Sequence, residues 1–109
     1  MTTGGPRGHR TPDERVLPAP RLLGLDARTE FRRDALRLLD SMREGGGRLI
    51  VDLSETTGVD SSGLNALILV RRHAVRRRQT VCLRNVSDHL RSLLILTKLD
   101  RQFELESGA

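Results

Sequence analysis

The chain has 109 residues, of which 37% are hydrophobic, and it carries a formal net charge of +5. This length predicts one domain with a single buried core. The sequence has one cysteine, no run of about 20 apolar residues and no apolar signal core at its start. These features argue against an internal disulfide, a membrane-spanning helix and a secretory leader. We therefore expect a cytoplasmic protein that does not engage a membrane.

Arginine accounts for 18 of the 19 basic residues, and the arginines are spread along the chain. A nucleic-acid surface would cluster them and interleave aromatic side chains that stack on bases. Tyrosine and tryptophan are absent, so we interpret the scattered charge as a solvated surface and expect no direct nucleic-acid contact. An arginine-rich nucleic-acid-binding protein remains the alternative of a different class.

The N-terminal part of the chain contains little that could form a core. Residues 1–14 hold glycine, proline and charge with almost nothing apolar, which predicts a flexible N-terminal tail ahead of a domain at 15–109. Pro18 and Pro20 each lack a backbone donor, so a strand around them must be short and lie at the edge of a sheet. A second short strand is expected at 21–25.

Hydrophobic periodicity predicts three helices and several strands in the rest of the chain. The first helix is expected at 29–43, capped by Asp26 or Thr29 and ended by the glycine triplet that follows it. The later elements are a strand at 49–53 covered on both faces, a helix at 62–77, a strand at 80–86, a helix capped by Ser87 and Asp88 that ends before Leu99, and a strand at 102–105. Alternating strands and helices predict a small α/β domain with a mainly parallel sheet. Phe31, Cys82 and Phe103 are expected in its core.

The segment Asp60-Ser61-Ser62-Gly63 lies at the start of the second helix, and functional residues of parallel sheets gather at such places. A hydrolytic serine is disfavoured, because there is no G-x-S-x-G elbow and no histidine with an evident route to Ser61. A Mg²⁺ site formed by Asp52 and Asp60 has weak support, because two carboxylates specify little. We expect neither a metal nor a cofactor.

Two interpretations of the serines remain. Ser61 and Ser62 can simply cap the helix, which composition and spacing favour. Alternatively, one hydroxyl accepts a phosphate, because the positive end of the helix dipole tolerates the added charge. A partner docked over that hydroxyl beside Asp60 would not tolerate it.

Three segments together resemble the STAS-domain anti-sigma factor antagonists of bacteria. They are Leu49–Ser54, Val59–Leu64 with its D-S-S-G-L run, and Leu90–Phe103 with the pattern L-L-x-L-T-x-L-D-x-x-F. The resemblance covers about residues 22–105. It implies the small STAS fold, a mixed and mostly parallel sheet with helices packed on it.

The resemblance also implies a function without catalysis. Members of the family bind a serine-kinase anti-sigma factor when unphosphorylated and so free a sigma factor. Carried over, Ser61 accepts phosphate from that kinase, a phosphatase acting on Ser61 reverses the step, and Asp60, Ser62, Gly63 and Leu64 form the partner surface. A STAS scaffold or lipid-transport component without a phosphorylation cycle is the alternative of the same class.

This sequence departs from the family pattern in places. The family often has glycine where Arg78-Gln79 and Lys98 stand, so these turns are expected to be strained or differently shaped. The family's last helix has no counterpart before the chain ends at Ala109. We expect apolar surface to be exposed there, which a partner or self-association would cover.

Overall fold

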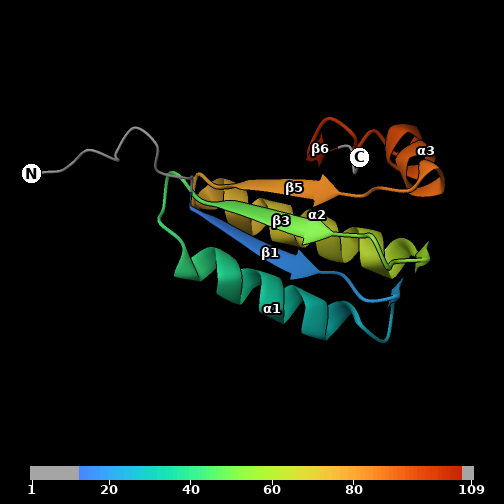
Figure 1. Ribbon diagram of the computed structural model, residues 1–109, viewed down its shortest axis with the longest axis horizontal. Coiled ribbons are helices and arrows are strands. Elements are labelled where there is room, and N and C mark those ends of the chain that lie inside the picture. Colours follow the sequence, from blue (N-terminus) through green and yellow to red (C-terminus); the bar gives the residue numbers. More distant parts are fainter. Residues whose placement is uncertain (1–12, 107–109) are drawn as a thin grey trace, which may run out of the picture.

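A computed structural model describes residues 13–106, and it shows strands and helices that alternate along the chain (Figure 1). The elements are β1 (Glu14–Pro18), β2 (Leu22–Leu23), α1 (Arg28–Ser41), β3 (Arg48–Asp52), β4 (Gly58–Val59), α2 (Ser61–Arg76), β5 (Thr80–Arg84), α3 (Asp88–Leu96) and β6 (Glu104–Glu106). Most of the tail expected at residues 1–14 lies outside the described residues. Glu14, which that expectation included, belongs to a strand.

Four strands form one sheet in the order β1-β3-β5-β6, and β2 and β4 form a separate two-stranded pair. Every strand pair in the described part of the chain is parallel. This agrees with the predicted α/β class, because each parallel pair needs a crossover connection such as a helix.

Strand β1 lies at the edge of the sheet, as its prolines predicted. The N–H of Ala19 donates to the carbonyl oxygen of Asp52 at 2.9 Å, and the carbonyl oxygen of Asp13 accepts from Arg48 N–H at 2.9 Å. Bonding groups alternate along a parallel strand, so the odd-numbered residues of β1 bond to β3. Pro18 therefore directs its missing donor outward, where no hydrogen bond of the sheet is lost.

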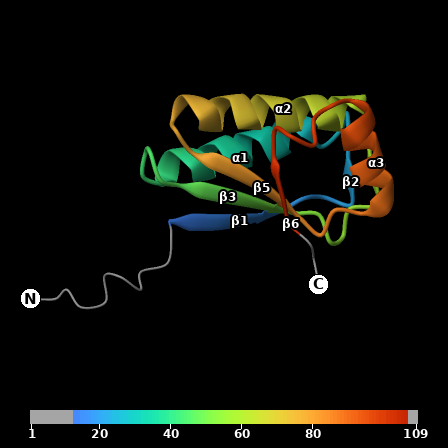
Figure 2. The same cartoon turned by 90° about the horizontal axis from the view of Figure 1, so that it is seen from above.

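Helices α1 and α2 lie side by side on one face of the sheet, and α3 lies at the end toward which the strands run (Figure 2). None of the helices within residues 13–106 has both the length and the apolar character to cross a bilayer. The buried core contains both phenylalanines and the alternate residues of β3 and β5, namely Phe31, Phe103, Leu49, Val51, Val81 and Leu83. The amphipathic pattern of the sequence therefore located this core correctly.

In the part of the chain that the structure describes, no helix covers the opposite face of the sheet (Figure 2). Ile50 and Cys82 are nevertheless buried, at 1% and 0% exposure. The guanidinium of Arg48 lies on the same face and pairs with Glu14 at 2.9 Å and with Glu104 at 2.8 Å. The expectation that β3 is covered on both faces holds, but ion-paired side chains rather than a second layer of helices lie beside its outer apolar residue.

Both expected boundaries of α1 are wrong. Its N-cap is Ala27, which makes no side-chain hydrogen bond, so neither Asp26 nor Thr29 caps it. The carbonyl oxygen of Gly24 instead accepts from Arg28 N–H at 2.9 Å, which closes the first turn. The helix ends at Ser41, before the glycine triplet.

The far ends of α1 and α2 are joined by polar side chains. Gln79 is 4% exposed, and its Nε2 donates to the carbonyl oxygen of Leu39 at 2.8 Å. His73 Nε2 lies 2.8 Å from Asp40 Oδ1, and Arg77 Nε lies 3.6 Å from the same oxygen. Nothing in the sequence pattern predicted that Gln79 is buried, because its partner Leu39 lies 40 residues earlier in the chain.

The turns that follow α2 and α3 each contain a residue in the left-handed region. Arg78 has φ 57° and Lys98 has φ 61°. After α3, Leu99 N–H donates to the carbonyl oxygen of Leu94 at 2.8 Å, which is a Schellman closure that glycine favours. The strain expected at these two turns is confirmed.

Candidate functional site

The segment from Asp60 to Leu64 lies where β4 leads into α2, at the end of the molecule toward which the strands run (Figure 1). Asp60 is the N-cap of α2, and its Oδ1 accepts the N–H of Gly63 at 2.9 Å. The cap is therefore the aspartate and not either serine, and the helix begins at Ser61. The aspartate satisfies one of the free donors that every helix start presents.

Ser61 is exposed and Ser62 is half-buried. Within residues 13–106, neither hydroxyl has a hydrogen-bond partner, because the capping role has passed to Asp60. The hydroxyl of Ser61 is thus open to solvent at the positive end of a 16-residue helix.

Gly63 is buried against the backbone of β2. A Cβ atom at this position would lie 2.0 Å from the carbonyl oxygen of Leu23. That same carbonyl oxygen accepts from Asp60 N–H at 3.3 Å. Gly63 therefore lets β2 lie directly on the first turn of α2.

Gly24 makes a second close approach. A Cβ atom there would lie 2.4 Å from Asp60 Oδ2. One carboxylate oxygen of Asp60 thus caps α2 while the other lies against the turn that leads into α1. The start of both helices meets at this one side chain, which the sequence did not indicate because Gly24 and Asp60 are 36 residues apart.

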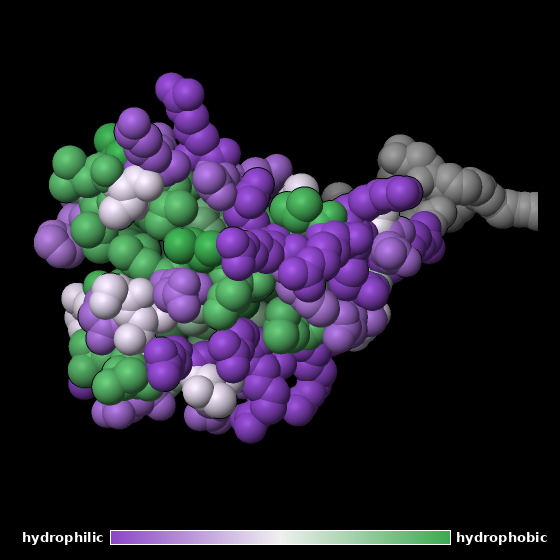
Figure 3. Space-filling model, turned by 180° about the vertical axis from the view of Figure 1, so that it is seen from behind, coloured by the Kyte–Doolittle hydropathy of each residue, from purple (hydrophilic) through white to green (hydrophobic). Residues whose placement is uncertain are grey.

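Exposed apolar side chains gather around this end of the molecule. Leu22 is 65% and Leu25 is 61% exposed on either side of Gly24, and Leu96 at the end of α3 is 79% exposed. Figure 3 shows apolar side chains concentrated at the left of the view, whereas the right is mostly hydrophilic. Such exposed apolar surface is typical of protein interaction sites.

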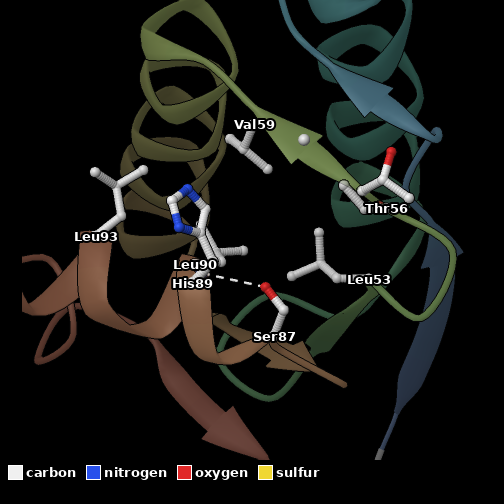
Figure 4. Close-up of a pocket in the computed structure, with 9 residues that line it drawn as sticks. Leu53, Thr56, Val59, Ser87, His89, Leu90 and Leu93 are labelled. Carbon is white, nitrogen blue, oxygen red and sulfur yellow. Dashed lines mark hydrogen bonds between the residues drawn. The ribbon is translucent and has the colours of Figure 1, made fainter.

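A small cavity of about 20 Å³ lies between β4 and α3. Figure 4 shows apolar side chains from both elements around it, including Val59 and Leu93. The Oγ of Ser87 accepts from Leu90 N–H at 3.1 Å, so the predicted cap of α3 is confirmed for Ser87 (Figure 4), whereas Asp88 is the first residue of the helix. This volume holds about one water molecule, which is too little for a cofactor.

The two carboxylates considered as a metal site have separate structural roles. Asp52 Oδ1 accepts from Asn85 Nδ2 at 2.9 Å and from Ser54 N–H at 3.0 Å. The hydrogen bond from Asn85, followed by the one from Ser54, holds the pKa of Asp52 below its ordinary value. Asp60 is occupied as a cap, and residues 13–106 contain no group of three or more side chains suited to holding a metal.

Residues 16–106 match the protein-family model described as "Mlab, STAS domain". The chain therefore belongs to the STAS domain family, whose members are generally non-catalytic regulatory modules. A STAS-domain containing protein of Pseudomonas aeruginosa is 34% identical over 58 residues, which are 53% of this chain and 57% of that protein. The match thus spans little more than half of that relative.

Solved structures share the fold at low identity. An anti-sigma-factor antagonist (STAS) domain protein from Planctomyces limnophilus has a TM-score of 0.74 and 15% identity, over 86% of this chain and 81% of that one. The anti-sigma factor antagonist SpoIIAA in its unphosphorylated form gives 0.68 and 15%, over 92% and 84%. A sulfate transporter family protein from Wolinella succinogenes gives 0.64 and 16%, over 86% and 77%. These likenesses confirm the STAS fold and go no further.

Proposed function

We propose that the protein is an anti-sigma factor antagonist controlled by phosphorylation. In its unphosphorylated form it binds a serine-kinase anti-sigma factor in the cytoplasm and so releases a sigma factor. The observation that carries this proposal is the solvent-open hydroxyl of Ser61 at the first residue of α2, next to a cap formed by Asp60 and beside exposed leucines.

The switch is electrostatic. The partner docks on the apolar surface around Leu22, Leu25 and Leu64 and covers the hydroxyl of Ser61, while Asp60 and Ser62 lie at the margin of the contact. A phosphate adds a charge of about −1.5 to −2 beside the Asp60 carboxylate. The dipole of α2 tolerates this charge, but a covered interface does not, because it would have to remove water from a dianion. A phosphatase acting on Ser61 restores binding.

The modification is tested with the cognate kinase and ATP. Kinase action transfers the terminal phosphoryl group of ATP to Ser61 Oγ, with loss of the hydroxyl proton and release of ADP. Mass spectrometry is expected to find one added phosphate in the unmodified chain and in Ser62→Ala, and none in Ser61→Ala. Phosphate on Ser62, or uptake that Ser61→Ala does not abolish, would contradict the assignment.

The electrostatic step is tested by a pair of variants with nearly the same shape. Ser61→Asp adds a negative charge where Ser61→Asn adds an uncharged group of the same size. We expect Ser61→Asp to weaken binding to the anti-sigma factor at least about tenfold more than Ser61→Asn does. Equal affinities for the two variants would count against the charge mechanism.

A STAS component of a larger assembly, without a phosphorylation cycle, is the second candidate. It is favoured by the matching family model, which carries the description "Mlab, STAS domain", and by the shared fold of a sulfate transporter family protein. This candidate predicts that the protein purifies in a stable complex whose composition is the same for Ser61→Ala and Ser61→Asp. Under the first proposal, the amount of partner that co-purifies differs between Ser61→Ala and Ser61→Asp.

A further inference from the structure

We propose that Arg28 and Arg32 of α1 hold the phosphate when Ser61 is phosphorylated. The inference rests on the proposed function for the identity of the modified residue. What is new is the identity of the groups that bind the phosphate, because Arg28 and Arg32 lie on α1 whereas Ser61 lies on α2. Phosphorylation then ties the start of α2 to the start of α1, besides repelling a docked partner.

The four arginines of α1 fall into two pairs. Arg33 lies 3.8 Å from Glu30 and 3.7 Å from Asp34, and Arg37 lies 4.0 Å from Asp34. Arg28 and Arg32 are exposed, and within residues 13–106 neither forms an ion pair. Arg33 and Arg37 thus lie near acidic side chains of α1, whereas Arg28 and Arg32 are available to bind a phosphate.

The register of the two helices brings the available pair to the start of α2. Arg28 lies twelve residues before Asp40 on α1, and Ser61 lies twelve residues before His73 on α2, so both stretches rise by about 18 Å along their axes. The contact of 2.8 Å between Asp40 Oδ1 and His73 Nε2 joins the two helices at one end. Both helices run opposite to the parallel strands and lie side by side in Figure 2. Counting back by turns from this contact brings Arg28 to the level of Ser61.

Contacts at the other end hold the starts of the two helices together. Arg28 N–H donates to the carbonyl oxygen of Gly24 at 2.9 Å. Gly24 is in turn the residue whose Cβ would lie 2.4 Å from Asp60 Oδ2. The backbone of Arg28 is therefore one hydrogen bond away from the residue that Asp60 touches, and Ser61 follows Asp60 directly. A long arginine side chain can span the remaining gap.

Arginine suits this role chemically. Its planar guanidinium donates two parallel hydrogen bonds to a phosphate and stays charged at every physiological pH. Two arginines one turn apart offset the dianion and the neighbouring Asp60 carboxylate. New charge-assisted bonds of this kind order the segment that carries the phosphate.

The test uses full-length protein with phosphoserine introduced at position 61 during translation, so no kinase is needed. Two double variants are compared, Arg28→Gln/Arg32→Gln and Arg33→Gln/Arg37→Gln, which remove the same charge from the same helix. We expect phosphoserine to raise the melting temperature by about 4 °C or more in the wild type and in the second variant, and to lose that gain in the first. In parallel, ³¹P NMR is expected to find the second pKa of the phosphate higher in the first variant by about half a unit or more.

Equal changes in the two double variants would mean that the phosphate senses only net charge, and would overturn the proposal. No change in either variant would overturn it as well. Arg28→Lys/Arg32→Lys keeps both positive charges but loses the two parallel hydrogen bonds that a guanidinium donates. We expect this variant to show part of the gain in melting temperature. Failure of the kinase to modify Ser61 would instead count against the proposed function, because the installed phosphoserine tests the arginines independently.

Discussion

The two helices that cover the sheet are joined at both ends, but by different means. At the end where the strands begin, a buried amide from Gln79 and the side chains of His73 and Arg77 connect α2 to α1. At the end where the strands finish, β2 and the turn into α1 lie on the start of α2 because Gly24 and Gly63 have no side chains. Asp60 is the polar side chain shared by both helix starts there.

The two ends also differ in what they leave open to solvent. The first end has several polar contacts that join α1 and α2. The second end depends on close backbone approach and one carboxylate, and it leaves a serine hydroxyl and apolar side chains open to solvent. Under the proposed function, a charge added there changes what the surface binds, and the buried contacts of Gln79 lie at the other end of the helices.

The largest expected loss of stability comes from a substitution at the second end, where the strands finish. In Gly63→Ala the new methyl group would overlap the carbonyl oxygen of Leu23, since the two would lie 2.0 Å apart. We expect a loss of about 3 kcal/mol in the free energy of unfolding, measured by chemical denaturation. Gly46→Ala is the control, because no atom lies within 4 Å of its Cβ position. Equal stability of the two variants would contradict the packing account.

A smaller effect is expected at the first end. Gln79→Ala removes the buried donor to the carbonyl oxygen of Leu39, which then keeps only its longer hydrogen bond from Met42 N–H at 3.2 Å. The expected loss is about 2 kcal/mol in the free energy of unfolding. Gln102→Ala, at an exposed position, is expected to change stability by less than about 0.5 kcal/mol. If the two glutamine variants unfold alike, the buried amide does not join the helices.

The helix cap is expected to contribute less again. Asp60→Ala removes the acceptor for Gly63 N–H, at a cost of about 1 kcal/mol. Asp26→Ala sharpens the comparison, because Asp26 caps nothing in α1 and its replacement should be nearly neutral. Thermal unfolding of both variants followed by circular dichroism distinguishes the caps, and the opposite order of stability would refute the assignment.

The smallest expected change is a gain. Lys98→Gly relieves the left-handed backbone at φ 61°, and we expect the protein to become more stable by up to about 1 kcal/mol. Lys98→Ala retains the strain and should give no gain. A glycine variant less stable than the alanine variant in urea denaturation would mean that the turn is not strained.

The fold followed from the sequence because each element carries its own local pattern. A compact apolar run predicted β3, alternating apolar residues predicted β5, helical spacing predicted α1 and α2, and Ser87 marked the start of α3. The D-S-S-G-L run and its neighbouring strand identified the family, which the match over residues 16–106 confirms.

The features that were missed depend on contacts between distant parts of the chain. Gly63 against Leu23, Gly24 against Asp60 and the buried Gln79 have no local signal. The start of α1 was predicted wrongly for the same reason, since the carbonyl oxygen of Gly24 closes the first turn in place of a capping side chain. The roles of Ser61 as phosphate acceptor and of its neighbours as a partner surface stay predictions.

The most direct measurement is the affinity of the anti-sigma factor for two forms of the full-length protein, with serine or with phosphoserine at position 61. Isothermal titration calorimetry in the same buffer gives both dissociation constants. The account predicts that phosphoserine weakens binding at least about 100-fold, because a desolvated dianion beside Asp60 costs several kcal/mol. Dissociation constants that agree within about twofold would contradict it. Such a ratio is far smaller than even a tenfold change, which corresponds to roughly 1.4 kcal/mol.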